Sequence, residues 1–214
     1  MFDRIAGVYD VMNSVMTAGL HHRWRERAAD LARVGLGSRA LDVATGTGDL
    51  AIALARRGAE VFGSDFSEGM LERARAKSSD VRWEQANALA LPYPDDAFDA
   101  ATVGFGARNF ADLERGLAEM TRVVRPGGRV VVLEITRPTK PPLSTFFSLW
   151  FDRVVPLLGR LAGEDQAYAY LPSSVKRFPG TAELGAVMDA VGLGDVRWIV
   201  TAGGIIALHS GTVA

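Results

Sequence analysis

The stretch LDVATGTGDL, residues 41–50, holds two closely spaced glycines between two apolar runs. This order is typical of a strand, a tight turn and a helix, which together hold nucleotide-like ligands in α/β proteins. Gly46 and Gly48 carry no side chain, so the backbone can come close to such a ligand. The third glycine of a dinucleotide fingerprint is absent, because Leu50 and Ala51 stand in that region. A plain tight turn without a ligand is the alternative interpretation of this loop taken alone.

Asp49, at the start of the expected helix, discriminates between ligands. A carboxylate would repel the pyrophosphate that a dinucleotide places at a helix N-terminus. The same carboxylate would attract the ammonium and sulfonium groups of S-adenosylmethionine. We therefore expect this cationic nucleoside, and not a dinucleotide, on the loop.

Polar residues after the next two expected strands extend this site. Asp65 follows the loop by roughly 20 residues, where a carboxylate can accept hydrogen bonds from both ribose hydroxyls. Asn87 can bind the exocyclic amine of adenine, and the backbone N–H of Ala88 can bind a ring nitrogen. Because the carboxyl ends of parallel strands meet at one edge of a sheet, we expect these groups to lie together.

Alternating strands and helices must position these residues. Short apolar runs alternate with helical patterns through the middle of the chain, which indicates a parallel sheet covered on both faces. A tight turn is predicted at RPGG, residues 125–128. The expected strands of this part are residues 39–45, 59–65, 81–87, 98–106 and 129–136.

The end of the chain, residues 196–211, reads as two strands joined in a hairpin at Gly203 and Gly204. An antiparallel last strand on an otherwise parallel sheet is typical of methyltransferases and is generally absent from dinucleotide-binding folds. The predicted fold is therefore a doubly wound α/β fold: a mostly parallel, seven-stranded, Rossmann-like class I methyltransferase sheet with an antiparallel last strand and a helical lid. A chain of 214 residues suits a single domain, 1–214, with the lid at 1–36 and a helical insertion at about 138–179.

The bulk composition excludes several classes of protein. The net charge of −1 gives no electrostatic footprint for nucleic acid, so no nucleic-acid partner is expected. With no cysteines, disulfides, thiolate metal sites and a cysteine nucleophile are excluded, and no metal site is predicted. The first ten residues do not read as a signal peptide, and no apolar run is long enough to span a membrane. We expect a cytoplasmic protein.

Five stretches together resemble the C-methyltransferases of ubiquinone and menaquinone biosynthesis, a family of which this chain resembles the demethylmenaquinone methyltransferase type. LDVATGTGDLA is shared with many methyltransferases, whereas the other stretches are not needed by methyltransferases in general. The resemblance covers essentially the whole chain. The stretches are YDVMNSVMTAGLHHRWR, LDVATGTGDLA, GFGARNFAD, YAYLPSSVKRFP and GGIIALHSG.

The resemblance implies S-adenosylmethionine as the methyl donor and a prenylated quinol as the acceptor, demethylmenaquinol in the first place. Many relatives have serine where this chain has Gly104, so a hydroxyl contact with the cofactor is lost there or replaced by backbone. The residues predicted to bind the cofactor are Gly46, Thr47, Gly48, Asp49, Asp65, Phe66, Asn87, Ala88 and Gly104.

Four residues are predicted to act in catalysis. Arg108 follows the fourth expected strand; its guanidinium stays protonated, so it would lower the pKa of the quinol or hold a water that takes the proton. Asn109 would orient the ring hydroxyl. His21 titrates near neutral pH, and Tyr9 belongs to a polar patch on the first helix. The alternatives are an ion pair on the sheet edge for Arg108, a solvated or capping His21, and Tyr9 as an anchor of the helix.

The aromatic stretch FFSLWFDRVVPLL, residues 146–158, has three interpretations. It would line a groove for the isoprenoid tail, touch the membrane surface peripherally, or cover the sheet and form a homodimer contact.

Alternatives also stay open for the function. The acceptor would instead be the methoxybenzoquinol of ubiquinone biosynthesis, or another small phenolic or lipid molecule. A nicotinamide-dependent reductase is disfavoured by Asp49 and Leu50 and by the lack of a Tyr-x-x-x-Lys pair after the fourth strand. A cofactor-binding module without chemistry is disfavoured because both donor-side and acceptor-side stretches are retained.

Overall fold

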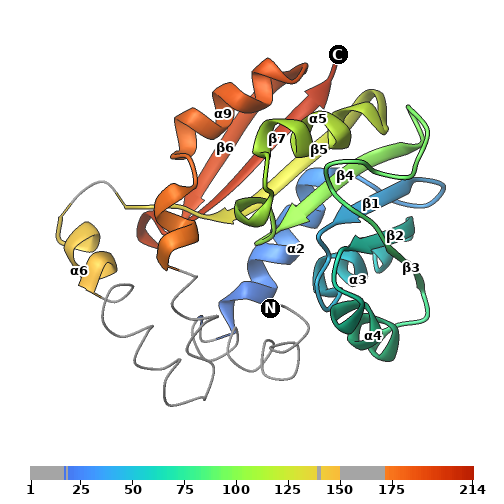
Figure 1. The fold of residues 1–214 in the computed structure, drawn as a ribbon, viewed down its shortest axis with the longest axis horizontal. Coiled ribbons are helices and arrows are strands. Elements are labelled where there is room, and N and C mark those ends of the chain that lie inside the picture. The colour runs from blue at the N-terminus through green and yellow to red at the C-terminus, as the bar shows by residue number, and fades with distance from the viewer. Residues whose placement is uncertain (1–16, 18, 139–140, 150–171) are drawn as a thin grey trace.

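The computed structural model describes residues 17, 19–138, 141–149 and 172–214 of the chain. In this described part, seven strands form one sheet in the order β3-β2-β1-β4-β5-β7-β6 (Figure 1). The first five strands run parallel, and β7 pairs antiparallel with both β5 and β6. The strands are β1 Arg39–Val43, β2 Glu60–Asp65, β3 Val81–Gln85, β4 Phe98–Gly104, β5 Val124–Ile135, β6 Leu193–Thr201 and β7 Ile206–Val213.

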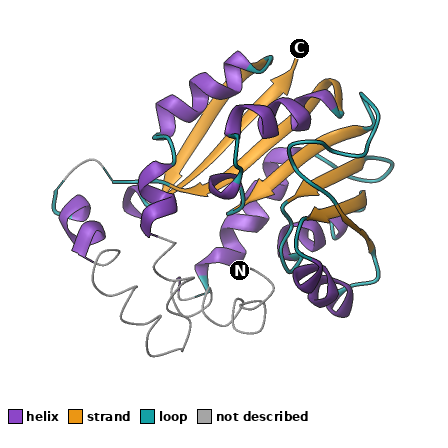
Figure 2. Ribbon diagram, in the orientation of Figure 1, coloured by secondary structure: helices purple, strands orange, loops and turns teal. Residues whose placement is uncertain are grey.

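Helices cover both faces of this sheet (Figure 2). Buried side chains of α2 and α3 form one apolar cluster with the sheet, and those of α5 and α9 form another on the opposite face. The sheet order, the antiparallel β7 and the two helical layers confirm the predicted fold class. The helices are α2 Leu20–Ala32, α3 Asp49–Ala55, α4 Glu68–Lys77, α5 Leu113–Arg122, α6 Leu143–Leu149 and α9 Thr181–Ala190, with short 3₁₀ turns η1 Ala107–Asn109 and η3 Ala202–Gly204.

The central strands form where they do because they are apolar on both faces. Residues 130–134 of β5 are all fully buried, as are the residues at 100–103 of β4. Such continuous burial requires helices above and below, which the chain supplies between the strands. Helix starts are fixed locally: Ser67 caps α4 by accepting a hydrogen bond from the N–H of Met70, and Asp112 caps α5 in the same way.

One predicted turn is part of a strand. The RPGG segment was expected to form a tight turn, but β5 begins at Val124 and continues through it. The pairing passes from Phe98–Val124 to Ala100–Arg129, so the glycines form a bulge. A Cβ on Gly128 would lie 2.4 Å from Val124 Cγ1, which is why only glycine fits.

The C-terminal hairpin is confirmed, with η3 as its turn between β6 and β7. Figure 1 shows β7 between β5 and β6, so the last strand along the chain lies inside the sheet. Gly203 and Gly204 have φ of 66° and 95°, values that glycine adopts without strain.

Parts of the predicted lid and insertion lie outside the described residues, and so does Tyr9. The part of the lid that is described, α2, packs its buried Ala28, Ala29 and Ala32 against α3 and the sheet. It therefore belongs to a helical layer of the fold. Among the residues that the structure describes, no helix combines the length and the apolar character needed to cross a membrane.

Candidate active site

A cavity of about 310 Å³ lies at the carboxyl ends of β1, β2, β3 and β4. The loops after these strands supply most of its lining, and α2 adds one side chain, Arg25. The cavity brings together every residue predicted to bind the cofactor except Gly48. Those that line it are Gly46, Thr47, Asp49, Asp65, Phe66, Asn87, Ala88 and Gly104.

The carboxylate of Asp65 is held in place by backbone groups. Its Oδ2 accepts a hydrogen bond from the N–H of Gly46 at 2.8 Å, and its Oδ1 accepts one from the N–H of Ser67 at 2.9 Å. These two bonds orient the carboxylate of Asp65, which lines the cavity. Gly46 has φ of 57°, and a Cβ there would meet nothing within 4 Å, so the loop is open at this point.

Gly48 was predicted to let the backbone approach a ligand, whereas the structure shows that packing against Trp83 requires a glycine there. It does not line the cavity, and a Cβ on it would lie 2.4 Å from the indole Cη2 of Trp83. Gly63 faces the same ring at the same distance. The second glycine of the loop therefore makes room for Trp83 of β3, and its φ of 86° favours glycine as well.

Asp49 is surrounded by positive groups that the sequence pattern did not reveal. The Lys77 ammonium lies 2.8 Å from Asp49 Oδ1 and donates a hydrogen bond of 2.8 Å to the hydroxyl of Thr47. Burial pushes the pKa of Asp49 up, but the charge of Arg25, the bond from Lys77 and the charge of His22 push it down, and the net pKa lies below its usual value. Asp49 is therefore ionised, but its charge is already shared with Lys77.

The part of the cavity predicted to bind adenine pairs a polar group with an exposed ring. Asn87 accepts a hydrogen bond from the N–H of Leu89 at 3.0 Å, which fixes the side-chain oxygen and leaves its second lone pair for an amine. Phe66 lines the cavity with 76% of its surface exposed, so it offers a flat face for stacking. At Gly104 a Cβ would lie 3.1 Å from Leu50 Cδ2, so a serine there would crowd that leucine.

Arg108 forms a buried ion pair at the end of β4. Its Nη1 lies 2.6 Å from Oε1 of Glu134, a β5 residue that is 1% exposed, and donates a hydrogen bond to the Phe105 carbonyl at 2.6 Å. Arg108 is not among the residues that line the cavity. The alternative of an ion pair at the sheet edge is the one that the structure shows. Glu134 was missed, although an acidic residue within the apolar run VVVLEI was a visible signal.

Asn109, whose role toward the ring hydroxyl stays a prediction, belongs to the cavity lining. It lines the cavity beside Phe105, and its side-chain oxygen is buried with no hydrogen-bond donor among the described residues. A buried acceptor without a donor is costly, so a hydrogen bond donated to this atom by a ligand hydroxyl would be favourable.

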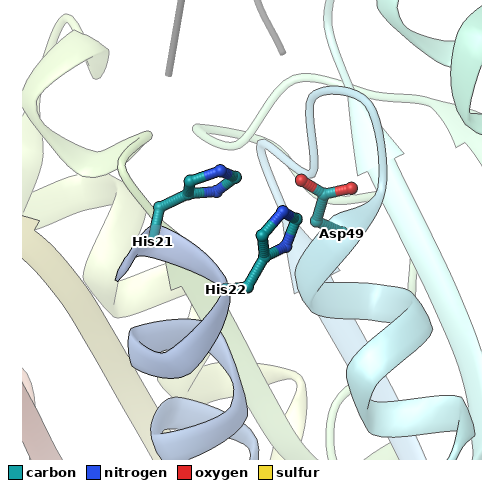
Figure 3. Close-up of side chains that lie close together, drawn as sticks. All are labelled: His21, His22 and Asp49. Atoms are coloured by element: carbon teal, nitrogen blue, oxygen red, sulfur yellow. The ribbon is translucent and has the colours of Figure 1, made fainter. Parts of the chain in front are cut away.

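His21 and His22 turn toward each other and toward Asp49 (Figure 3). Although these two residues are adjacent on a helix, their ring centroids are 3.9 Å apart at the first turn of α2. His21 is buried and receives a hydrogen bond from Arg25 at its Nδ1. The ligand atoms of the three residues lie within 4.8 Å of one another, but Arg25 already engages His21 and Lys77 engages Asp49.

Asp42, in the middle of β1, is a second buried carboxylate that the sequence interpretation passed over. Each of its oxygens accepts a hydroxyl hydrogen bond of 2.6 Å, one from Thr45 and one from Thr102. Burial raises the pKa of Asp42 to about 6, against the lowering effect of these bonds and of Arg25. A lone acid in the apolar run ALDVA was the available signal.

The fold and the site together define a class I methyltransferase. The sheet with its antiparallel β7 superimposes on a SAM-dependent methyltransferase from Thermotoga maritima with a TM-score of 0.66, covering 97% of this chain and 98% of that one at 22% identity. A SAM-dependent methyltransferase from Aquifex aeolicus gives 0.64, covering 89% of both chains at 18% identity. At these identities the likeness concerns the fold.

The chain belongs to the ubiE/COQ5 methyltransferase family, whose model matches residues 1–213. It is 49% identical to the demethylmenaquinone methyltransferase of Thermus thermophilus, over 99% of both chains. It is 48% identical to the demethylmenaquinone methyltransferase of Deinococcus radiodurans, over 90% of this chain and 83% of that protein. It is 41% identical to the ubiquinone/menaquinone biosynthesis C-methyltransferase UbiE of Geobacter sulfurreducens, over 99% of this chain and 86% of that protein. The resemblance found in the sequence is thus confirmed.

Proposed function

We propose that this enzyme transfers the methyl group of S-adenosylmethionine to a ring carbon of demethylmenaquinol and so forms menaquinol. The observation that carries the proposal is that Asp65, Asn87 and Asn109 line one cavity, which therefore offers donor-binding and acceptor-binding groups to the same space. The two relatives that are nearly half identical to this chain and carry the name demethylmenaquinone methyltransferase support the naphthoquinol as acceptor.

The residues present fit the donor. Asp65 places a carboxylate at the cavity for the ribose hydroxyls, Asn87 keeps an acceptor site for the adenine amine, and the exposed ring of Phe66 lines the same cavity. When bound, S-adenosylmethionine supplies an electrophilic methyl group on a sulfonium. The protein holds it at the carboxyl edge of the sheet, beside the loop that carries Asn109.

On the acceptor side the protein must favour the phenolate form of the quinol. Transfer of one hydroxyl proton to water would raise the electron density at the neighbouring ring carbon. That carbon could then take the methyl group that the donor supplies, the sulfur would keep the electron pair of the broken bond, and the ring proton would pass to water to restore aromaticity. Asn109 accepts a hydrogen bond from the other ring hydroxyl, which keeps its proton, and so orients the ring. Arg108 acts as a positioning residue, because it holds the Phe105 carbonyl from below the loop.

The test is a methyl-transfer assay with labelled S-adenosylmethionine and chemically reduced demethylmenaquinone. The matching prenylated methoxybenzoquinol and a small phenol without a prenyl chain run in parallel, and products are read by mass. Methylation of the naphthoquinol at the highest rate is expected. Preference for the benzoquinol would assign the enzyme to ubiquinone biosynthesis, and methylation of neither prenylated quinol would overturn the proposal.

The acceptor also suggests where the enzyme works. A prenylated quinol resides in the membrane, so we propose that the protein acts from the cytoplasm and touches the membrane surface peripherally, as a homodimer. Sedimentation with vesicles that contain demethylmenaquinone, compared with vesicles that lack it, tests the membrane contact. Analytical ultracentrifugation tests the dimer, which a single monomeric species at all concentrations would contradict.

A further inference from the structure

Arg25 is the one cation on α2 that reaches the cavity, among the residues that the structure describes. Its side chain is buried, with 7% of its surface exposed, and it lines the cavity opposite the β1–α3 loop. Neighbouring Arg23 and Arg27 on the same helix are exposed to solvent. Arg25 therefore differs from its neighbours in that its charge is buried within the fold.

The contacts of Arg25 are unusual for a buried guanidinium. It donates to Nδ1 of His21 and lies over the ring of Phe105, with 5.2 Å between the guanidinium carbon and the ring centroid. Within the described residues it forms no ion pair with a carboxylate. A guanidinium has five N–H donors, so most of its donors remain for an anion in the cavity.

The charges around Arg25 indicate what kind of anion fits. Because Arg25 forms no direct ion pair among the described residues, its guanidinium can bind a ligand carboxylate by two parallel hydrogen bonds. Asp42 and Asp49 lie near enough for their carboxylates to feel the charge of Arg25, so a positive group of the same ligand is also accommodated here. Side by side, these charges complement a zwitterion, an ammonium next to a carboxylate.

We propose that Arg25 forms the binding subsite for the α-carboxylate in the amino-acid part of the methyl donor. The inference rests on the proposed function, because it takes S-adenosylmethionine as the occupant of the cavity. His21 then has a positioning role: its ring fixes the Arg25 guanidinium, which Phe105 supports from one side. The ribose and adenine are bound by other residues, so Arg25 recognises only the amino-acid end.

Binding calorimetry with three ligands tests this assignment without any methyl acceptor. S-adenosylmethionine carries the carboxylate, decarboxylated S-adenosylmethionine keeps both cationic groups and lacks the carboxylate, and methylthioadenosine lacks the whole amino-acid part. The protein variants are Arg25→Met and, as the control on the same helix, Arg27→Met. Arg25→Met should weaken binding of S-adenosylmethionine by about 10- to 100-fold, since a charge-assisted pair is lost. It should leave the affinities for the other two ligands within about twofold of the wild type.

The outcomes separate the inference from the function on which it rests. Equal losses for all three ligands, or no loss for S-adenosylmethionine, would overturn the role of Arg25. A wild type that binds none of the three would overturn the proposed function itself. If Arg25→Met does not fold, Arg25→Lys replaces it, and the same criterion applies to the ratio of affinities for S-adenosylmethionine and its decarboxylated form.

Discussion

Four charged side chains are buried in the fold, and one of them, Arg25, lines the cavity. Asp42, Glu134, Arg25 and Arg108 are all at least nine-tenths buried at the side chain or residue level. Each is oriented by named partners: hydroxyls for Asp42, an ion pair for Glu134 and Arg108, and a ring and an imidazole for Arg25. Such groups lower stability unless paired, so their presence marks the site.

Replacement of Glu134 by Gln tests the ion pair beneath the β4–α5 loop. The variant removes the charge and keeps the shape, which leaves the Arg108 guanidinium without its buried counter-charge. Breaking a buried pair costs about 3–5 kcal/mol of unfolding free energy, measured by chemical denaturation. We also expect kcat to fall by about 10-fold or more with little change in KM for S-adenosylmethionine, because the loop that carries Asn109 shifts.

The matched control is Glu68→Gln, which removes an exposed ion pair with Arg75 on α4. It should change the unfolding free energy by less than about 1 kcal/mol. A Glu134→Gln variant that loses stability and keeps its full kcat would show that Glu134 is structural only.

Asp42 makes stability depend on pH in a direction that can be worked out. Its pKa is raised to about 6, so the folded protein binds a proton that the unfolded chain releases near 3.8. This contribution to stability is full below about pH 4 and is lost as pH rises through about 6. The Asp42→Asn variant has no ionisable side chain at this position. Its unfolding free energy, measured relative to that of the wild type, should therefore rise by on the order of 2 kcal/mol when the pH goes from 4 to 7.5. Denaturation curves at the two pH values measure this, and parallel pH profiles would contradict it.

At the scale of elements, the β1–α3 loop uses its two glycines for different purposes. Gly46→Ala adds a methyl group to open space at a φ of 57°, so it should lower the unfolding free energy by only about 1 kcal/mol while it weakens donor binding. Gly48→Ala drives a methyl group into Trp83, so it should lower the unfolding free energy by about 3 kcal/mol or more. Thermal melting and calorimetry measure both effects. Equal destabilisation by the two variants would contradict this division.

The sequence was sufficient to predict the strands and helices because the local signals within each of them agree with one another. Apolar strands, the Ser67 cap and the paired glycines of the hairpin all lie within a few residues of the features they determine. The sequence did not predict the contacts between residues that are distant along the chain. Lys77 contacts Asp49, Trp83 packs on Gly48, and Glu134 pairs with Arg108. The hydrophobic periodicity of a single helix or strand does not predict such contacts. The bulge in β5 was not predicted for the same reason, because it depends on the pairing of Val124 with Phe98 in the neighbouring strand β4.

At the scale of the whole molecule, all groups assigned to the cofactor and acceptor lie at one edge of the sheet. Saturation with S-adenosylmethionine should therefore slow amide hydrogen exchange in the segments 44–49, 86–89 and 104–111, most of whose residues line the cavity. The bulge at 125–128, before the buried part of β5, should exchange as in the free protein. Mass spectrometry of peptic peptides measures this. Protection confined to segments away from the cavity would contradict the assignment of the site.

The place of β7 between β5 and β6 also governs the order in which the protein can form during synthesis. β6 emerges from the ribosome before the strand that joins it to the rest of the sheet, so it has no partner until β7 follows. The parallel strands with the donor loop can associate earlier, since all of them precede β6 along the chain. The sheet edge that lines the cavity is thus formed first, and the nascent chain exposes β5 as an open edge until the last strand inserts.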